Sequence, residues 1–168
     1  YLTYTEGFHS GGFYAVVQQT KHMRRNQYDP EFSESTELGY KAFLFDRRVQ
    51  LNAAYFINDY AGKQEESTQI DNETKTVASF WSNVAEAEYE GFEIDVQILV
   101  NEYLRVFANY GTLDASYQGF VTDINEGDGV TKLEPADFLT PRFAPEESWG
   151  VGGTLSIPAG QGTVDIFG

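Results

Sequence analysis

The sequence predicts an all-β fold, an antiparallel meander of about seven strands that forms part of a transmembrane β-barrel. Apolar residues recur at every second position over strand-length segments, which puts them on one face of a sheet. Short turns and long polar connections alternate along the chain, as they do in outer-membrane barrels. The short turns lie near 46–48, 100–102 and 159–162, and the long connections near 9–33, 63–79 and 120–146.

The first complete pair of predicted strands flanks the turn at Asp46–Arg48, and residues 1–8 look like the tail of an earlier strand. Its apolar positions are Leu38, Tyr40, Ala42 and Leu44 before the turn, and Val49, Leu51, Ala53, Tyr55 and Ile57 after it. The positions between them are mostly polar or small. We therefore expect each strand to have one apolar face and one mixed, polar face.

Two further hairpins repeat this pattern. Their apolar positions are Phe92, Ile94, Val96 and Ile98; Leu104, Val106, Ala108 and Tyr110; Trp149, Val151, Leu155 and Ile157; and Val164 and Ile166. Aromatic residues lie toward the predicted strand ends, where a barrel places an interfacial girdle. These are Tyr55, Tyr60, Trp81, Tyr103, Tyr110, Tyr117 and Trp149.

Two environments produce half-apolar alternation. A soluble β-sandwich buries the apolar face against a second sheet, whereas a membrane barrel turns it toward lipid. The apolar stripes are about 9–11 residues long, enough to cross a bilayer at a tilt. In hydrocarbon every backbone amide must be satisfied within the protein, so such a sheet closes on itself. We favour the barrel and keep the sandwich, as a glycan-binding module, as an alternative.

The totals exclude several classes of protein. The formal net charge of −15 leaves no basic field for a nucleic-acid backbone. The absence of cysteine removes disulfides, zinc–thiolate sites and thiol catalysis. No signal-like leader is visible, and the sequence starts and stops inside strand-like patterns, so we expect an excerpt of a longer protein. Ser, His and Asp form no nucleophile elbow, and we expect neither an enzyme nor a bound cofactor.

Five segments, in this order, resemble the β-barrel of TonB-dependent outer-membrane receptors. They are YLTYTEGFHSGGF (1–13), YDPEFSESTELGYKAFLFDRRVQLNAAYFINDY (28–60), NVAEAEYEGFEIDV (83–96), YGTLDASYQGF (110–120) and APEESWGVGGTLSIP (144–158). Ala85 replaces a frequent Gly of the third segment. The resemblance covers nearly the whole chain, and the order of the segments is more specific than any one of them.

The resemblance implies a barrel of about 22 strands in the bacterial outer membrane, with a plug domain inside it. Residues 1–168 would supply roughly strands 13–19 of that barrel, without the plug. It also implies TonB-energised uptake of a scarce ligand, a ferric siderophore foremost, with outer-membrane lipid and lipopolysaccharide as further partners. A passive porin-like channel is the alternative from another class.

Candidate ligand-binding residues lie in the long connections. The one basic cluster, KHMRR (21–25), contains His22, Arg24 and Arg25 and suits an anionic ligand or a lipopolysaccharide phosphate, although a solvated loop would look the same. The aromatic residues Tyr28, Trp81 and Phe138 could stack on a planar or sugar ligand, or pack the loops together. No metal site is predicted, because His22 has no second ligand nearby and the EF-hand-like 123–134 lacks its Gly.

Carboxylates concentrate between residues 86 and 95. Glu86, Glu88 and Glu90 share one parity, and Glu93 and Asp95 take the other, which argues against a glycosidase-like acid–base pair. We expect a strand rising out of the membrane, with Glu93 and Asp95 facing an aqueous lumen. Lys41 and Arg105 have the parity of lumen-facing residues as well.

Overall fold

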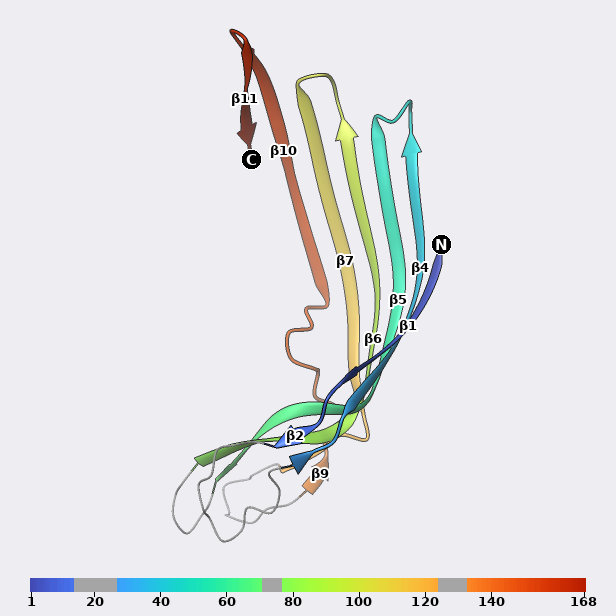
Figure 1. Cartoon of the computed structure of the whole chain (residues 1–168), viewed down its shortest axis with the longest axis vertical. Helices are drawn as coiled ribbons and strands as arrows, with labels where there is room; N and C mark the ends of the chain where they lie inside the picture. The colour runs from blue at the N-terminus through green and yellow to red at the C-terminus, as the bar shows by residue number, and fades with distance from the viewer. Residues whose placement is uncertain (14–26, 71–76, 124–132) are drawn as a thin grey trace.

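The computed structural model describes residues 1–13, 27–70, 77–123 and 133–168 as a curved antiparallel sheet with short accessory hairpins (Figure 1). Seven strands follow one another across the sheet in chain order. They are β1 (Leu2–His9), β4 (Glu31–Leu44), β5 (Val49–Ile70), β6 (Val77–Leu99), β7 (Leu104–Gln118), β10 (Glu147–Ala159) and β11 (Gly162–Phe167). The predicted seven-stranded meander is therefore confirmed.

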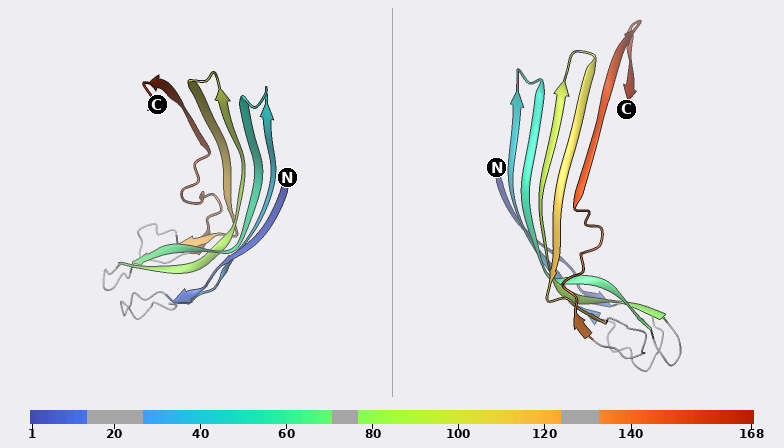
Figure 2. Two further views of the ribbon diagram at one scale, coloured as in Figure 1. Left: turned by 45° about the horizontal axis from the view of Figure 1, so that its top comes forward. Right: turned by 180° about the vertical axis from the view of Figure 1, so that it is seen from behind.

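The strands of the sheet end along two rims, called its edges here, and the connections at these two edges differ in length. Three short turns join β4 to β5, β6 to β7 and β10 to β11 at one edge, and the longer connections gather at the other (Figures 1 and 2). Two small hairpins lie within the long connections: β2 (Gly12–Phe13) pairs with β3 (Gln27–Tyr28), and β8 (Val121–Asp123) with β9 (Leu133–Pro135). No helix of the described residues is long and apolar enough to span a membrane.

The strands are longer than the sequence pattern predicts. The expected connection at 63–79 is wrong for most of its length, because β5 continues to Ile70 and β6 begins at Val77. Strand β4 likewise begins at Glu31, and β7 extends to Gln118. Beyond the lipid both faces of a strand meet water, so the apolar alternation that marks a strand inside the membrane disappears.

The strand register places the predicted apolar residues on one face. Leu51 pairs with Ala42 and with Val96, and Ala108 pairs with Val96 and with Val151. Directly paired residues of antiparallel strands point to the same side, so these five form a row across the wall. We call this side of the sheet the apolar face.

The other side, the polar face, is equally continuous. Asn52 pairs with Lys41 and with Asp95, and Asn109 pairs with Asp95 and with Gly150. This row runs beside the apolar row and points the opposite way, because neighbouring residues of a strand alternate between faces.

The apolar face carries no second layer in the part of the chain that the structure describes. Leu38 is 60% exposed, Val151 is 72% exposed and Trp149 is 75% exposed. The buried apolar side chains of the described residues are Ala87, Tyr117 and Ala136, far too few for the core of a sandwich. An apolar face of this size is stable only against another apolar medium, which is what a barrel wall meets in a membrane.

Gly91 has no side chain, which leaves room for the ring of Phe56 on the polar face. A Cβ added there would lie 2.5 Å from Phe56 Cζ and 2.6 Å from the carbonyl oxygen of Thr112. We expect Gly91→Ala to lower the free energy of unfolding by about 1–3 kcal/mol, because the backbone oxygen cannot move aside. Denaturant titration of the protein in lipid vesicles measures this. Gly162→Ala is the control, since its added Cβ has its nearest atom at 3.9 Å; equal losses would contradict the explanation.

Candidate functional site

A bulge in β5 creates a corner at the edge of the long connections. The register between β5 and β6 shifts between Tyr60 and Lys63 and again between Lys63 and Gln64. Gly62 has φ of +65°, a left-handed conformation that glycine adopts at no steric cost. Bulges of this kind bend a strand. Residues 64–70 and 77–83, here called the arm, therefore turn away from the line of the wall (Figure 1).

The arm lies over the polar face. The Tyr117 hydroxyl of β7 donates a hydrogen bond of 2.8 Å to Glu65 Oε1 of β5, although β6 separates these two strands. Lys63 Nζ lies 4.8 Å from the centroid of the Tyr60 ring and 5.7 Å from that of Tyr89. At the base of the arm, therefore, the side chain of Glu65 reaches over β6 to β7, and Lys63 lies over the rings of β5 and β6.

The tyrosine side chains of the corner are partly shielded from water. Burial raises the pKa of Tyr89 to about 12, with the negative charge of Glu65 adding to the effect. Burial also raises the pKa of Tyr117, and its hydrogen bond to Glu65 raises it further. Both phenols therefore stay protonated at a higher pH than an ordinary tyrosine does, and Tyr117 remains a donor to the Glu65 carboxylate there.

A hollow of about 400 Å³ lies beside the arm, at the β2–β3 hairpin. Its lining combines three aromatic rings with backbone groups: Phe8, Ser10, Gly11, Gly12, Phe13, Gln27, Tyr28, Asp29 and Pro30. The Tyr28 ring also meets Trp81 of the arm, with 6.4 Å between ring centroids and 40° between ring planes. Phe13 is 75% exposed, so apolar ring surface is available here to a planar ligand.

The structure brings some of the predicted ligand-binding residues together and leaves others apart. Tyr28 and Trp81, 53 positions apart in the chain, form the aromatic pair. Phe138 is 73% exposed in the connection between β9 and β10 and does not line the hollow. His22, Arg24 and Arg25 lie outside the described residues.

The four charged residues predicted to face a lumen all lie on the polar face. Lys41 and Asp95 share one row through Asn52, and Glu93 lies two positions from Asp95 on the same strand. Arg105 pairs with Leu99 and Thr154, one row nearer the short turns than Phe107. Lys41 Nζ lies 5.3 Å from the centroid of the Tyr1 ring.

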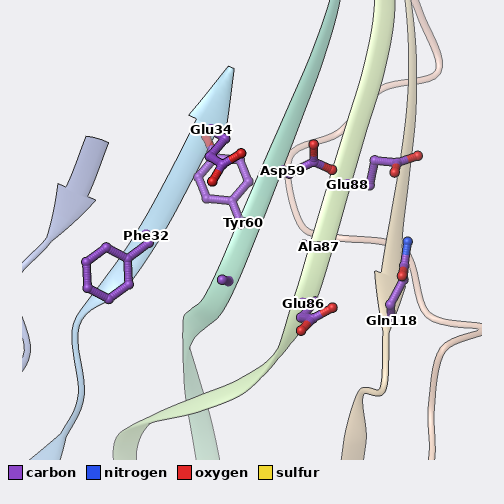
Figure 3. A pocket seen from close by; sticks show the side chains of 9 residues that line it. Phe32, Glu34, Asp59, Tyr60, Glu86, Ala87, Glu88 and Gln118 are labelled. Carbon is purple, nitrogen blue, oxygen red and sulfur yellow. The ribbon is translucent and has the colours of Figure 1, made fainter. Parts of the chain in front are cut away.

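The apolar face becomes acidic toward the long connections. One row joins Glu6, Glu34, Asp59 and Glu88 across four strands. A hollow of about 370 Å³ opens here (Figure 3). It is lined by Phe32, Glu34, Asp59, Tyr60, Ala61, Glu86, Ala87, Glu88 and Gln118. The register confirms the parity split, because Glu86, Glu88 and Glu90 lie on the opposite face of β6 from Glu93 and Asp95.

Tyrosines mark the border between the apolar and acidic parts of this face. The Tyr4 hydroxyl donates a hydrogen bond of 2.9 Å to Glu6 Oε1, and the Tyr55 hydroxyl donates one to Glu90. The Tyr110 hydroxyl donates a longer one, of 3.3 Å, to Glu147 Oε1. A phenol with its ring beside lipid and its hydroxyl in the wet layer suits a membrane interface. Tyr60, Tyr117 and Trp81, predicted for the same girdle, instead belong to the corner and the arm. No cluster of His, Asp and Glu in the described ranges could hold a metal ion.

Sequence reasoning missed the residues that build the corner: Lys63, Gln64, Glu65, Asn83 and Tyr89. Gly62 was the available signal, because an isolated glycine inside a strand indicates a bulge.

Comparisons with known proteins identify the family and the fold. The family model described as TonB dependent receptor-like, beta-barrel matches residues 1–156. A probable TonB-dependent siderophore receptor, PiuA of Acinetobacter baumannii, is 29% identical over 151 residues, which cover 82% of this chain and 19% of that protein. The crystal structure of the ferric yersiniabactin uptake receptor FyuA from Yersinia pestis shares the fold, with a TM-score of 0.67 and 18% identity, over 98% of this chain and 21% of that one. The chain thus spans about a fifth of the length of each relative.

Proposed function

Because this chain belongs to the β-barrel family of TonB-dependent receptors, we propose that it walls part of an uptake pathway and helps to capture a scarce ligand outside the cell. The family consists of non-enzymatic transporters of the outer membrane, so the apolar face contacts outer-membrane lipid. The match of the family model over residues 1–156 carries the proposal.

The polar face would then line the aqueous interior, with Lys41, Glu93, Asp95 and Arg105 in contact with water or with a plug domain. In this arrangement residues 1–168 supply roughly strands 13–19 of a barrel of about 22 strands. The periplasmic side is the edge with short turns, and the extracellular side is the edge with long connections. TonB would act on the plug rather than on these residues.

We propose a ferric siderophore as the ligand class. PiuA of Acinetobacter baumannii is a probable siderophore receptor, and it aligns with most of this chain. The hollow at the β2–β3 hairpin offers ring surface from Phe8, Phe13 and Tyr28, which suits the planar groups of many iron chelators. The basic cluster at 21–25 suits an anionic complex or lipopolysaccharide phosphate.

Uptake by a receptor-deletion strain tests this function. The strain receives the full-length receptor gene and a panel of ferric siderophores, haem, cobalamin and oligosaccharides. We expect growth or uptake to return for a ferric siderophore and to stop when TonB is also deleted. Uptake that persists without TonB would support the passive channel instead, and restored uptake of a different compound would replace the ligand class.

Aromatic substitutions test the hollow. We expect Trp81→Ala or Tyr28→Ala to weaken binding of the transported complex about tenfold, which corresponds to about 1.4 kcal/mol and to the loss of one well-placed ring contact. Saturation binding to whole cells measures the affinity. Trp149→Ala is the matched control, because Trp149 lies on the apolar face and should not touch the ligand. Equal effects of all three variants would contradict the site.

A further inference from the structure

Two residues with amide side chains lie side by side on neighbouring strands where the arm leaves the wall. Gln64 of β5 pairs in register with Asn83 of β6, directly after the bulge. Asn83 Oδ1 accepts a hydrogen bond of 2.7 Å from the backbone nitrogen of Asp29, and its Nδ2 donates to the carbonyl oxygen of Asp29 at 2.9 Å. The same Nδ2 donates to the carbonyl oxygen of Gly62 at 2.6 Å. Asn83 therefore ties the first connection to the bulge.

Gln64 makes a second set of ties. Its side chain is only 5% exposed, and its Nε2 lies within hydrogen-bond distance of three carbonyl oxygens. These belong to His9 at 3.3 Å, Ser10 at 3.3 Å and Asp29 at 3.0 Å. Its backbone nitrogen donates to Glu31 Oε2 at 2.7 Å. Gln64 thus joins the end of β1, the segment before β4 and the arm.

These ties adjoin the aromatic pair. Asp29 directly follows Tyr28, and Asn83 lies two residues after Trp81. Ser10 and Asp29 also line the hollow. The two amides therefore fix the backbone on both sides of the Tyr28–Trp81 contact.

We propose that Gln64 and Asn83 form an amide clasp that positions Trp81 against Tyr28 and joins residues 9–13, residues 27–31 and the arm into one ligand-capture unit. This inference rests on the proposed function, ligand capture at the extracellular edge. Both are positioning residues, because they act through the ring pair rather than on the ligand.

The chemistry of the clasp explains the residue types. Residues 10 and 29 lie outside the ladder of the main sheet, and His9 is the last residue of β1 in that ladder. Buried backbone polar groups without partners cost free energy. An amide offers donors and an acceptor together, which no apolar or carboxylate side chain does. Asn83 uses both, whereas Gln64 uses its donors only, because its buried Oε1 has no hydrogen-bond partner among the described residues. Because amides carry no charge, the clasp should hold equally well in low and high salt.

Hydrogen exchange of the full-length receptor in lipid vesicles tests the clasp. We expect Asn83→Ala to accelerate amide exchange at least tenfold in peptides covering both 27–31 and 62–70. Asn101→Ala is the matched control, because Asn101 Oδ1 also accepts backbone hydrogen bonds, from Tyr103 at 2.8 Å and Leu104 at 2.9 Å, but at the opposite edge. It should leave both peptides unchanged. Protection of residues 92–98 shows that each variant still forms the wall.

Fluorine NMR of the receptor labelled with 5-fluorotryptophan reads the ring pair itself. The Trp81 resonance is assigned with Trp81→Phe, and we expect Asn83→Ala and Gln64→Met to shift it toward its solvent-exposed value. Gln64→Met keeps the side-chain volume and removes the donors, so a shift there separates hydrogen bonding from packing.

The outcomes separate the clasp from the proposed function. Unchanged exchange and an unchanged Trp81 resonance in both variants would overturn the clasp. If both change while cells still bind the iron(III) complexes of a catecholate and a hydroxamate siderophore as the wild type does, the role of the clasp in capture is overturned. If wild-type cells bind neither complex, the siderophore proposal fails, and the exchange and NMR results still decide whether the clasp exists.

Discussion

Leu51→Arg should lower the free energy of unfolding in a bilayer by about 2–4 kcal/mol, the cost of an arginine at the midplane of the lipid-facing surface. Leu51 lies in the apolar row that runs from Ala42 to Val151. Rows of apolar residues flank it on both sides, so its side chain cannot easily reach the wet layer. Denaturant titration of the full-length receptor refolded into lipid vesicles measures the loss.

Gln50→Arg is the matched control, one position away on the polar face. Gln50 pairs with Phe43 and Gln97, and an arginine there would extend into the aqueous interior. We expect a change of less than about 1 kcal/mol, as for other exposed polar positions. Equal losses at positions 50 and 51 would contradict a membrane wall, because only a one-sided lipid environment makes neighbouring residues so different.

The membrane part of the fold could be predicted because lipid imposes its pattern on the sequence. Leu51 and Val96 must face acyl chains, while Asn52 and Asp95 must not. The alternation of apolar and polar residues therefore shows where a strand lies and which face each side chain is on. Short turns such as the one at 46–48 then fix which strands pair. These constraints act residue by residue, and one sequence is enough to read them.

The strand ends and the corner could not be predicted, because water removes that constraint. The polar run Glu31–Glu37 has no apolar parity, yet it pairs fully with β1. Tyr60 and Tyr117 are aromatic residues near strand ends and so resemble girdle residues. Their register with Ser33 and Ala87 places them on the polar face instead. The strand pattern alone could not assign these two tyrosines to a face, because outside the lipid polar and apolar residues no longer alternate.

The candidate site divides in the same way. Tyr28 and Trp81 could be singled out as loop aromatics, but their contact depends on the bulge at Gly62 and on the hydrogen bonds of Asn83. A glutamine and an asparagine in a polar stretch carry no signal in the sequence. Their role arises from which backbone groups lie nearby, and only the folded arrangement determines that.

Tyr117→Ala should destabilise the corner by about 3–5 kcal/mol, the usual cost of deleting a buried aromatic ring. Tyr117 is 6% exposed, its ring stacks on Phe120 with 4.7 Å between centroids, and its hydroxyl holds Glu65 of the arm. Hydrogen exchange should show the arm opening while residues 92–98 stay protected, because the wall does not depend on this ring. Tyr117→Phe keeps the ring and removes only the hydrogen bond, so we expect a loss of about 1 kcal/mol. If Tyr117→Phe opened the arm as far as Tyr117→Ala does, the hydrogen bond to Glu65, rather than ring packing, would hold the arm over the polar face.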